Sequence, residues 1–277
     1  MGMVSSERIF KILEDDSEIN DNGIIEQSSF NGLIEFKNVK FSYIENQLVI
    51  NDISFKIYPG ETTAIVGPTG SGKTTITNLI TKFYEIDSGS ILIDGRDINE
   101  FKLENIRKKI GVILQDVFLF ADTIFNNITL FNNEISIKDV ERAAKDLEIH
   151  DFILSLPGGY DFNVSERGST LSSGQKQLIA FLRVLVNNPD ILILDEATSS
   201  IDSYSEDLIK NATKKITMGK TSIIIAHRLS TVESADKIIY MENGRILEYG
   251  NHRELLNIPN GKFKKLYEEQ FVENELV

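Results

Sequence analysis

A glycine-rich run lies between an apolar segment and an amphipathic one, and its residue types suit the binding of phosphate groups. The run is Gly67-Pro68-Thr69-Gly70-Ser71-Gly72-Lys73-Thr74-Thr75, which fits the pattern G-x-x-x-x-G-K-[ST]. Its glycines let the backbone fold tightly round a phosphate, so that successive N–H groups point at the anion. Lys73 adds a positive charge and Thr74 offers a hydroxyl to Mg²⁺. The run therefore predicts a P-loop for a nucleoside triphosphate, between a strand over 62–66 and a helix over 74–83.

Two carboxylates follow a second apolar run, Ile191-Leu192-Ile193-Leu194. The run does not alternate with polar residues, which is typical of a central parallel strand buried on both faces. Ligands of open α/β sheets lie beyond the carboxyl ends of the strands, so Asp195 and Glu196 would lie beside the P-loop if the two strands are neighbours. Asp195 would then hold Mg²⁺ through water, and Glu196 would orient or deprotonate the attacking water. The alternative is an acidic turn after a core strand.

A third segment, Leu171-Ser172-Ser173-Gly174-Gln175, opens a helix that we predict over 173–187. The free N–H groups and the positive dipole end at a helix start favour a phosphate. In isolation the segment fits an ordinary serine N-cap. Its position relative to the other motifs favours the phosphate site.

The composition excludes several classes of protein. The chain has 277 residues, no cysteine and three histidines, so we expect one to two domains, no disulfide or thiolate metal site, and a reducing compartment. A net charge of −13 disfavours binding to nucleic acid, which needs a basic surface. No apolar run approaches the ~18 residues that span a bilayer, so we expect a soluble chain without a transmembrane segment.

The order of the predicted elements indicates a mixed fold. A linker rich in Asn, Asp, Ser and Gly over 17–31 precedes two antiparallel strands over 33–43 and 48–57. Further strands are predicted over 90–93, 110–114, 191–194, 222–226, 237–241 and 245–247, and helices over 137–147, 149–156, 173–187, 205–215 and 262–270. The fold class is therefore α/β: a P-loop NTPase core with a mainly parallel sheet, an antiparallel β subdomain, and an all-helical insert between Asp116 and Pro189.

The order of the motifs resembles the ATPase domain of ABC transporters. The resemblance is carried by the P-loop, Gln115 after an apolar strand, the LSSGQ segment, the ILILDE segment, and His227 after a further strand. It covers nearly the whole chain from Leu33. It implies a linker over 1–32 from the last membrane helix of a half-transporter, or an unrelated remnant, and an ABC ATPase domain over 33–277 with a helical subdomain at about 116–189.

Three further segments are similar to exporter-type members of the family, namely Ser165-Glu166-Arg167-Gly168, the residues 225–231 around His227, and the N-terminal residues 6–10. Two positions depart from the usual pattern, since Ser173 replaces a glycine and Lys176 replaces an arginine. The segment around them looks closest to exporter subunits that work as heterodimers with one degenerate site.

The resemblance also implies roles for individual residues, with ATP and Mg²⁺ as cofactors. Catalytic roles fall to Glu196 as base, His227, Gln115 and Lys73, and Mg²⁺ would be held by Thr74, Gln115 and Asp195. Nucleotide contacts fall to Tyr43, which would stack on adenine, to residues 67–75, Gln115 and Asp195, and to Ser172, Ser173, Gly174 and Gln175. From their surroundings alone, Tyr43 also fits a half-buried packing residue and His227 a capped core histidine.

The partners implied are a second ABC ATPase domain, identical or different, and the transmembrane domains of an exporter. Two ATPase domains would face each other head to tail, with ATP clamped between the P-loop of one and the LSSGQ helix of the other. Residues 116–120 with Glu166 and Arg167 would contact the membrane domains at the cytoplasmic face of the cell membrane. The resemblance thus predicts an ATP hydrolase that drives substrate export.

Four alternatives are weaker. An importer ATPase is opposed by Glu166-Arg167 and by the N-terminal segment 6–13. A DNA-repair ATPase of the same superfamily would separate its halves by hundreds of residues, whereas Lys73 and Asp195 are about 120 positions apart. A translation factor of the ABC type would carry two cassettes. A module that only binds partners would be expected to lack Lys73 or Glu196.

Overall fold

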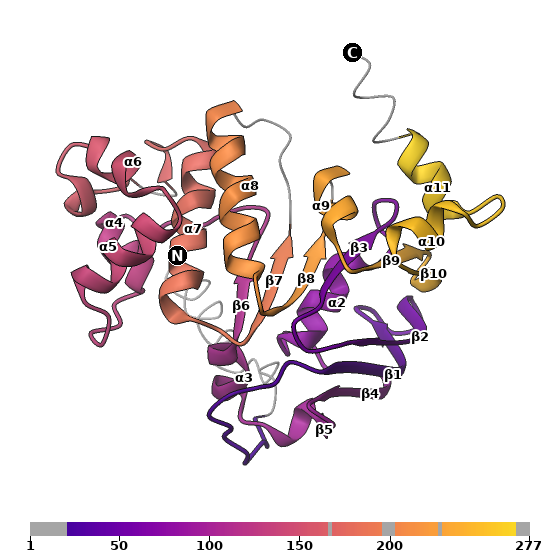
Figure 1. Ribbon diagram of the computed structural model, residues 1–277. Helices are drawn as coiled ribbons and strands as arrows, with labels where there is room; N and C mark the ends of the chain where they lie inside the picture. The colour runs from indigo at the N-terminus through magenta and orange to yellow at the C-terminus, as the bar shows by residue number, and fades with distance from the viewer. Residues whose placement is uncertain (1–20, 166–167, 196–202, 227–228, 270–277) are drawn as a thin grey trace, which may run out of the picture.

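Two β-sheets and a set of helices make up the part of the chain that the computed structural model describes, residues 21–165, 168–195, 203–226 and 229–269 (Figure 1). The strands are β1 Ile34–Ser42, β2 Leu48–Ile57, β3 Thr62–Val66, β4 Ser88–Ile93, β5 Arg96–Asp97, β6 Ile110–Ile113, β7 Ile191–Asp195, β8 Thr221–Ile225, β9 Lys237–Glu242 and β10 Arg245–Gly250. The α-helices are α2 Lys73–Ile80, α3 Leu103–Lys109, α4 Ile124–Thr129, α5 Ile137–Asp146, α6 His150–Ser155, α7 Ser173–Asn187, α8 Ser203–Thr217, α9 Leu229–Ser234, α10 His252–Leu256 and α11 Lys262–Tyr267. Single 3-10 turns are η1 Ile98–Glu100 and η2 Gly159–Asp161.

The larger sheet has six strands in the order β10-β9-β3-β8-β7-β6. Strands β9, β3, β8, β7 and β6 run parallel, and β10 pairs with β9 in the antiparallel sense. All five residues of β7 are buried, because helices cover both faces of the sheet and the strand lies inside it. The mainly parallel sheet predicted from the apolar runs is confirmed.

The smaller sheet is antiparallel, with the order β2-β1-β4-β5. The register pairs Ile34 with Ile57 and Ile34 with Ile93. Helix α2 lies between the two sheets, where Ile76 and Leu79 are buried in one cluster with residues of both sheets. The predicted antiparallel subdomain is thus confirmed, and its core is shared with the face of the larger sheet that carries α2.

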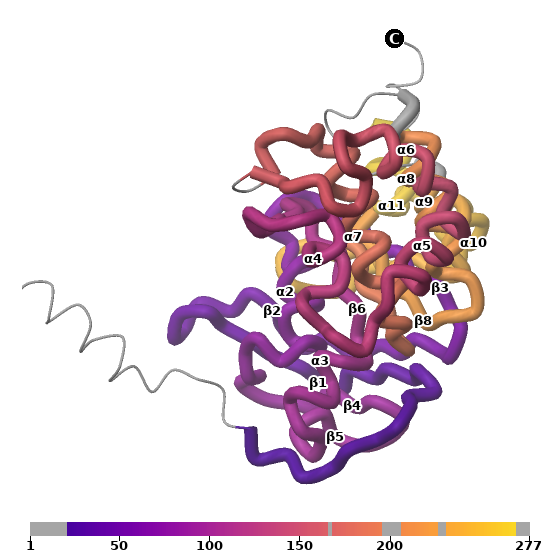
Figure 2. The backbone as a smooth tube through the Cα atoms, turned by 90° about the vertical axis from the view of Figure 1, so that its left-hand side faces the viewer, coloured from indigo at the N-terminus to yellow at the C-terminus, as the bar shows by residue number. Residues whose placement is uncertain are grey.

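The opposite face of the larger sheet is covered by two groups of helices. Helices α4 to α8 pack over the end of β6, β7 and β8, and Leu192 and Leu194 of β7 belong to their cluster. Helices α9, α10 and α11 pack near β3 and β9. Figure 2 shows α5, α6 and α7 on one side of the sheet and β1, β4 and β5 on the other. In the described part of 116–189 the chain forms helices and one isolated bridge between Thr123 and Asn163, which confirms the helical insert.

The segment 21–33 is attached to the domain along α3 and the loop after β4. Asn105 accepts a hydrogen bond from the backbone N–H of Gln27 (3.1 Å) and donates one to its carbonyl oxygen (3.0 Å). Asp94 accepts bonds from three successive backbone N–H groups, those of residues 31–33. Phe30 is buried in the core that the two sheets share. The described end of the predicted linker therefore packs as a fixed strap, and the domain boundary at residue 33 stays a prediction.

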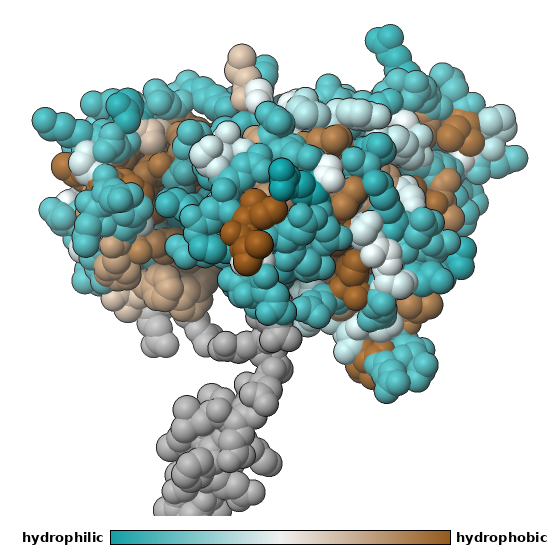
Figure 3. Space-filling view, turned by 90° about the horizontal axis from the view of Figure 1, so that it is seen from below, coloured by the Kyte–Doolittle hydropathy of each residue, from teal (hydrophilic) through white to brown (hydrophobic). Residues whose placement is uncertain are grey.

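The face seen in Figure 3 is largely hydrophilic, with small apolar groups scattered over it. Among the described residues, no helix combines the length and the apolar character that crossing a bilayer requires.

Candidate nucleotide-binding site

The loop between β3 and α2 folds closely against two other strands. Gly67 and Gly72 have φ angles of 146° and 102°, in the region that favours glycine. A Cβ atom on Gly67 would overlap the carbonyl oxygen of Met241 at the end of β9. One on Gly72 would lie 2.8 Å from Ile50 Cδ1 of β2. The glycines of the pattern are thus required by backbone conformation and by close packing at the same time.

The outer side of this loop is open, and a buried hydroxyl group lies on its packed side. A Cβ atom on Gly70 would have nothing within 4 Å. Pro68 and Thr69 beside it are exposed. Ser71 is 2% exposed, and its Oγ has no hydrogen-bond partner among the described residues. A Cβ atom on Gly67 would lie 3.2 Å from this Oγ and against the Met241 carbonyl oxygen, so the hydroxyl belongs to the packed side of the loop.

Lys73 is held over the same loop. Its Nζ donates hydrogen bonds to the carbonyl oxygens of Gly67 and Pro68, both at 2.9 Å. The side chain is buried, and burial lowers the pKa of the Lys73 ammonium below its ordinary value, while the Asp195 carboxylate opposes this shift. Because both hydrogen-bond acceptors are neutral, the ammonium charge remains for an anionic ligand.

Thr74 and Asp195 meet at the same end of the sheet. Thr74 Oγ1 lies 3.5 Å from Asp195 Oδ2, at the long limit of a hydrogen bond, and Asp195 is 8% exposed. The sequence suggested this meeting on the condition that β3 and β7 are neighbours, and that condition is wrong. Strand β8 lies between them, since Ile225 pairs with both Ile65 and Asp195.

Helix α2 bridges the gap that β8 creates. Its residues Ile76 and Leu79 pack in one cluster with Ile65 of β3, Ile223 of β8 and Ile193 of β7, which all face the same side of the sheet. The helix therefore starts at the end of β3 and lies beneath β8, so its first turn reaches the end of β7. Packing of the helix, rather than strand pairing, brings the two motifs together.

Tyr43 lies at the end of the antiparallel sheet, next to α2. Its hydroxyl donates to Thr75 Oγ1 (3.2 Å) and accepts from Asn78 Nδ2 (3.3 Å). The ring makes edge contacts with Phe41 and Tyr84, at centroid distances of 4.8 and 4.9 Å. The residue is 45% exposed. The structure thus places the predicted ring beside the P-loop helix with part of its surface free.

Gln115 follows β6, the strand beside β7, and is exposed. The register pairs Ile113 with Leu194, so Gln115 leaves the sheet at the edge where Asp195 stands. It is brought to the same end of the sheet as Thr74 and Asp195. Its contact with a metal ion stays a prediction.

The LSSGQ segment forms the start of α7. Ser172 Oγ accepts a hydrogen bond from the N–H of Gln175 (3.2 Å), and Gln175 Oε1 accepts one from the N–H of Ser172 (3.0 Å). This reciprocal pair is a capping box. Ser172 and Ser173 are exposed and Gly174 is buried. The serine N-cap is therefore present, and none of the described hydrogen bonds of Ser172 or Gln175 reaches residues 67–75.

Glu196 and His227 lie outside the described residues, as do Glu166 and Arg167. Three positions that hold the site were missed by the sequence analysis: Asn78, which bonds the Tyr43 hydroxyl, Met241, whose backbone lies against Gly67, and Gly244, whose N–H donates to the Ser71 carbonyl oxygen (3.1 Å). The last two lie more than 160 positions after the P-loop, and no local pattern connects them to it.

The geometry of the site and the comparison with known proteins indicate the same class of protein. A family model described as ABC transporter matches residues 50–199, more than half of the chain. The chain therefore belongs to the ABC transporter family, and it has the fold of the family's ATPase domain.

Flippases and an exporter are among the proteins that the chain is similar to. The chain is 44% identical over 272 residues to an ATP-dependent lipid A-core flippase of Haemophilus influenzae, which covers 98% of this chain and 46% of that protein. It is 45% identical over 269 residues to a flippase of the same name from Pseudomonas fluorescens, covering 96% of this chain and 44% of that protein. A solved structure of a bacterial Atm1-family ABC exporter with ATP bound matches it with a TM-score of 0.88 at 38% identity, over 97% of this chain and 47% of that one. The chain thus spans less than half the length of these relatives.

Proposed function

We propose that this chain binds and hydrolyses MgATP, and that it is the ATPase part of an exporter. The single observation that supports this best is the meeting of Thr74 and Asp195, from elements 121 positions apart, beside a lysine that is held on a glycine-rich loop. This arrangement brings cationic, hydroxyl and carboxylate groups together at one end of the sheet. Names of the relatives favour export over import, because they are exporters or flippases.

The triphosphate would lie on the outer side of the P-loop. Its oxygens would accept hydrogen bonds from the loop N–H groups, and the Lys73 ammonium would neutralise part of their charge. The adenine ring would stack on the free surface of Tyr43. The close packing of Gly67 and Gly72 holds the backbone of the loop against β9 and β2.

Oxygen ligands of the kind that Mg²⁺ prefers stand beside the loop. Thr74, Asp195 and Gln115 would hold the ion, directly or through water, and the bound ion would neutralise charge on the phosphate oxygens. Glu196, next in sequence to Asp195, would accept the proton of the attacking water, and His227 would contact the γ-phosphate. Asp195 is buried at a strand end, so it is suited to a fixed ligand role.

The start of α7 would complete the site of a second ATPase domain. Ser172 Oγ accepts its capping bond, so its own proton is still available for a phosphate oxygen of the partner's nucleotide. The helix N-terminus adds free N–H groups and its positive dipole end. ATP would then hold two domains together head to tail, and its hydrolysis would release them. The second domain would belong to an identical or a different chain.

The remaining part of the transporter would consist of transmembrane domains. Residues 1–32 would lead from the last membrane helix, residues 33–277 would form the ATPase domain, and 116–120 with Glu166 and Arg167 would contact the membrane domains from the cytoplasmic side. The exposed rings of Phe118 and Phe120, which meet edge to face at 5.1 Å, support a contact surface in this loop.

The variant Glu196→Gln tests this proposal. It should bind ATP without hydrolysing it, so we expect ATP to convert the 277-residue chain from monomer to dimer in size-exclusion chromatography. Adding Lys73→Ala to the same variant should abolish the ATP-induced dimer, which controls for effects of Glu196→Gln that do not require nucleotide. An undiminished steady-state hydrolysis rate in Glu196→Gln would remove Glu196 from the role of base.

A further inference from the structure

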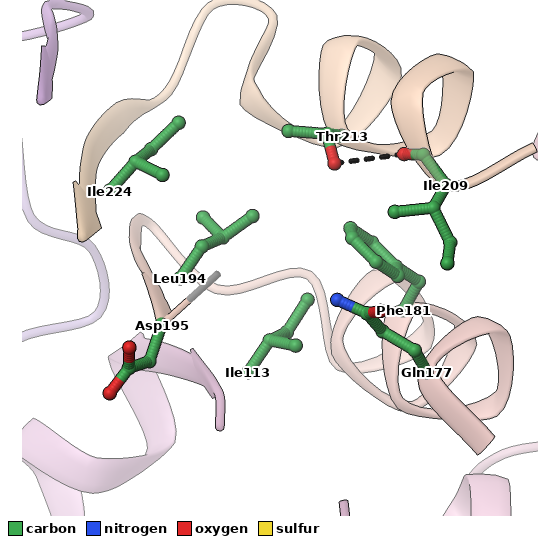
Figure 4. Close-up of a pocket in the computed structure, with 8 residues that line it drawn as sticks. All are labelled: Ile113, Gln177, Phe181, Leu194, Asp195, Ile209, Thr213 and Ile224. Atoms are coloured by element: carbon green, nitrogen blue, oxygen red, sulfur yellow. Dashed lines mark hydrogen bonds between the residues drawn. The ribbon is translucent and has the colours of Figure 1, made fainter. Parts of the chain in front are cut away.

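The P-loop has neighbours on both sides of β3, the strand that leads into it. On one side, beyond β8, Figure 4 shows the Asp195 carboxylate turned away from the apolar side chains of Leu194 and Ile224. This carboxylate lies near Thr74 in the first turn of α2. On the other side β9 pairs with β3, and the turn from β9 to β10 follows. Because that turn lies against the packed side of the loop, what it can contribute to the site is position.

The β9–β10 turn consists of Asn243 and Gly244, since Glu242 pairs with Arg245 across it. The φ angles of its two residues are 51° and 71°, and both are positive, as a two-residue hairpin turn of type I′ requires. Gly244 is nevertheless buried, whereas the tips of hairpins usually lie on the surface. The tip of this hairpin is therefore packed against other parts of the domain.

Gly244 contacts the P-loop and strand β2 at the same time. Its N–H donates a hydrogen bond to the carbonyl oxygen of Ser71 in the P-loop (3.1 Å). Its carbonyl oxygen accepts a hydrogen bond from the N–H of Asn51 in β2 (2.8 Å). A Cβ atom on Gly244 would overlap the carbonyl oxygen of Val49, also in β2. The turn thus joins the P-loop to the antiparallel sheet through backbone groups alone.

The glycines of the P-loop are packed against the same elements. A Cβ atom on Gly72 would lie 3.2 Å from the Val49 carbonyl oxygen and 3.6 Å from Met241 Cε, and one on Gly67 would overlap the Met241 carbonyl oxygen. Because the closest of these atoms belong to the backbone, rotation of side chains cannot absorb a shift of the turn. A shift of Gly244 must therefore move the P-loop, β2 or both.

We propose that Gly244 is a positioning residue of the nucleotide site, which holds the P-loop backbone in the conformation that binds phosphate. The inference rests on the proposed function, because it concerns the same site. Gly244 acts through the Ser71 carbonyl group and not through contact with the nucleotide. Nucleotide affinity depends on loop N–H groups that already point at the anion, so a displaced turn should weaken binding. By reciprocity, a nucleotide bound to the loop should hold the turn more firmly in place.

The variant Gly244→Ala tests the inference, with MgADP as the probe, because in the proposed function it is ATP that holds two domains together. Isothermal titration at a temperature where circular dichroism shows a folded chain should give a Kd for ADP that is raised by about tenfold or more. Gly95→Ala is the matched control. The Asp94-Gly95 turn is also a two-residue hairpin turn, with φ angles of 51° and 81°, and a Cβ atom on Gly95 would have nothing within 4 Å. This variant carries the same kind of backbone strain, so it should lower the melting temperature and leave the Kd for ADP unchanged.

Hydrogen exchange in the unsubstituted chain covers the case in which Gly244→Ala does not fold. MgADP should slow the exchange of the Gly244 and Asn51 amides by about tenfold or more, and should slow the amides of the control turn, residues 94–97, clearly less. Equal slowing in the two turns, or no slowing at Gly244, would overturn the inference. The same holds if Gly244→Ala and Gly95→Ala bind ADP equally well. If the unsubstituted chain does not bind ADP at all, the proposed function fails, and the inference fails with it.

Discussion

The Tyr43 side chain is held at its two ends by different kinds of contact, and these can be separated by mutation. Its hydroxyl bonds Thr75 and Asn78 of α2, and its ring lies perpendicular to the rings of Phe41 and Tyr84. The hydroxyl bonds therefore fix the position of the ring, part of whose surface stays exposed. The sequence predicted the ring, but not its hydroxyl partners, because Asn78 lies in a helix that gives no sign of facing another subdomain.

We expect Tyr43→Ala to weaken ATP binding by about tenfold or more, since stacking of a base on an aromatic ring contributes about 1–3 kcal/mol. Tyr43→Phe should keep most of the affinity, because it removes the hydroxyl and retains the ring. Isothermal titration with ATP measures both. Tyr84→Ala is the matched control, because Tyr84 is also 45% exposed and belongs to the same cluster. Equal losses in Tyr84→Ala and Tyr43→Ala would contradict a specific stacking role.

Lys73 illustrates why residue type could be predicted while its local geometry could not. The pattern of the P-loop specified a lysine near phosphate oxygens. The structure adds two neutral carbonyl partners and burial, and the burial lowers the pKa of the Lys73 ammonium. Those partners are backbone atoms of the loop itself, and their direction depends on the left-handed φ angles at the glycines, which appear only once the loop is folded.

At the scale of elements, the capping box of α7 has a close counterpart in α5. Ser136 Oγ accepts from the N–H of Asp139, and Asp139 accepts from the N–H of Ser136, as Ser172 and Gln175 do in α7. Both serines are exposed. The two helix starts therefore share their local chemistry and differ in the role that we propose for one of them.

We expect Ser172→Ala and Ser136→Ala each to lower the free energy of unfolding by about 1 kcal/mol, the usual cost of losing a serine N-cap. Only Ser172→Ala should also reduce ATP hydrolysis and ATP-driven dimerisation. Thermal or urea unfolding gives the first quantity, and steady-state hydrolysis at matched folded fraction gives the second. If both variants hydrolyse ATP at the same rate as the unsubstituted chain, Ser172 is a cap and nothing more.

The elements that could be predicted are those whose apolar pattern is long and has a recognisable start and end. Helix α7 begins and ends as predicted, because its apolar periodicity runs for 15 residues between the Ser172 cap and Asn188, whose φ of 42° ends the helix. Helices α3, α4, α9 and α10, with seven, six, six and five residues, were missed because they are too short to show a period of 3.6 and depend on tertiary packing. The order of the parallel strands was also beyond the sequence, so it could not be foreseen that β8 lies between β3 and β7.

At the scale of the whole molecule, the P-loop and the start of α7 are presented by different layers. The P-loop stands on the core between the two sheets, and α7 belongs to the helical insert on the opposite face. The side chains of Ser172 and Gln175 each accept a bond from the other's backbone N–H. In the proposed head-to-tail arrangement, a nucleotide on the P-loop takes its second set of contacts from the start of α7 of another molecule.

Mixing two inactive variants tests this arrangement directly. Lys73→Ala should disable the P-loop of a chain, and Gly174→Asp should place a carboxylate at the start of α7, where it would repel a phosphate. In a head-to-tail dimer of one variant with the other, one site carries both defects and the other site carries neither. If dimers form at random and the sites act independently, an equal mixture should recover about a quarter of the unsubstituted activity.

The way in which the recovered activity depends on the ratio of the two variants tests whether the site is shared. Steady-state hydrolysis is measured while the ratio of the two variants changes at constant total concentration, and the activity should be greatest at equal amounts and absent at either extreme. A double variant carrying both substitutions, mixed with Lys73→Ala, is the matched control: each of its mixed dimers has a defect at both sites, so no activity should return. If the equal mixture also stays inactive while both single variants fold and Gly174→Asp still binds ATP, the site is not shared between two copies of this chain.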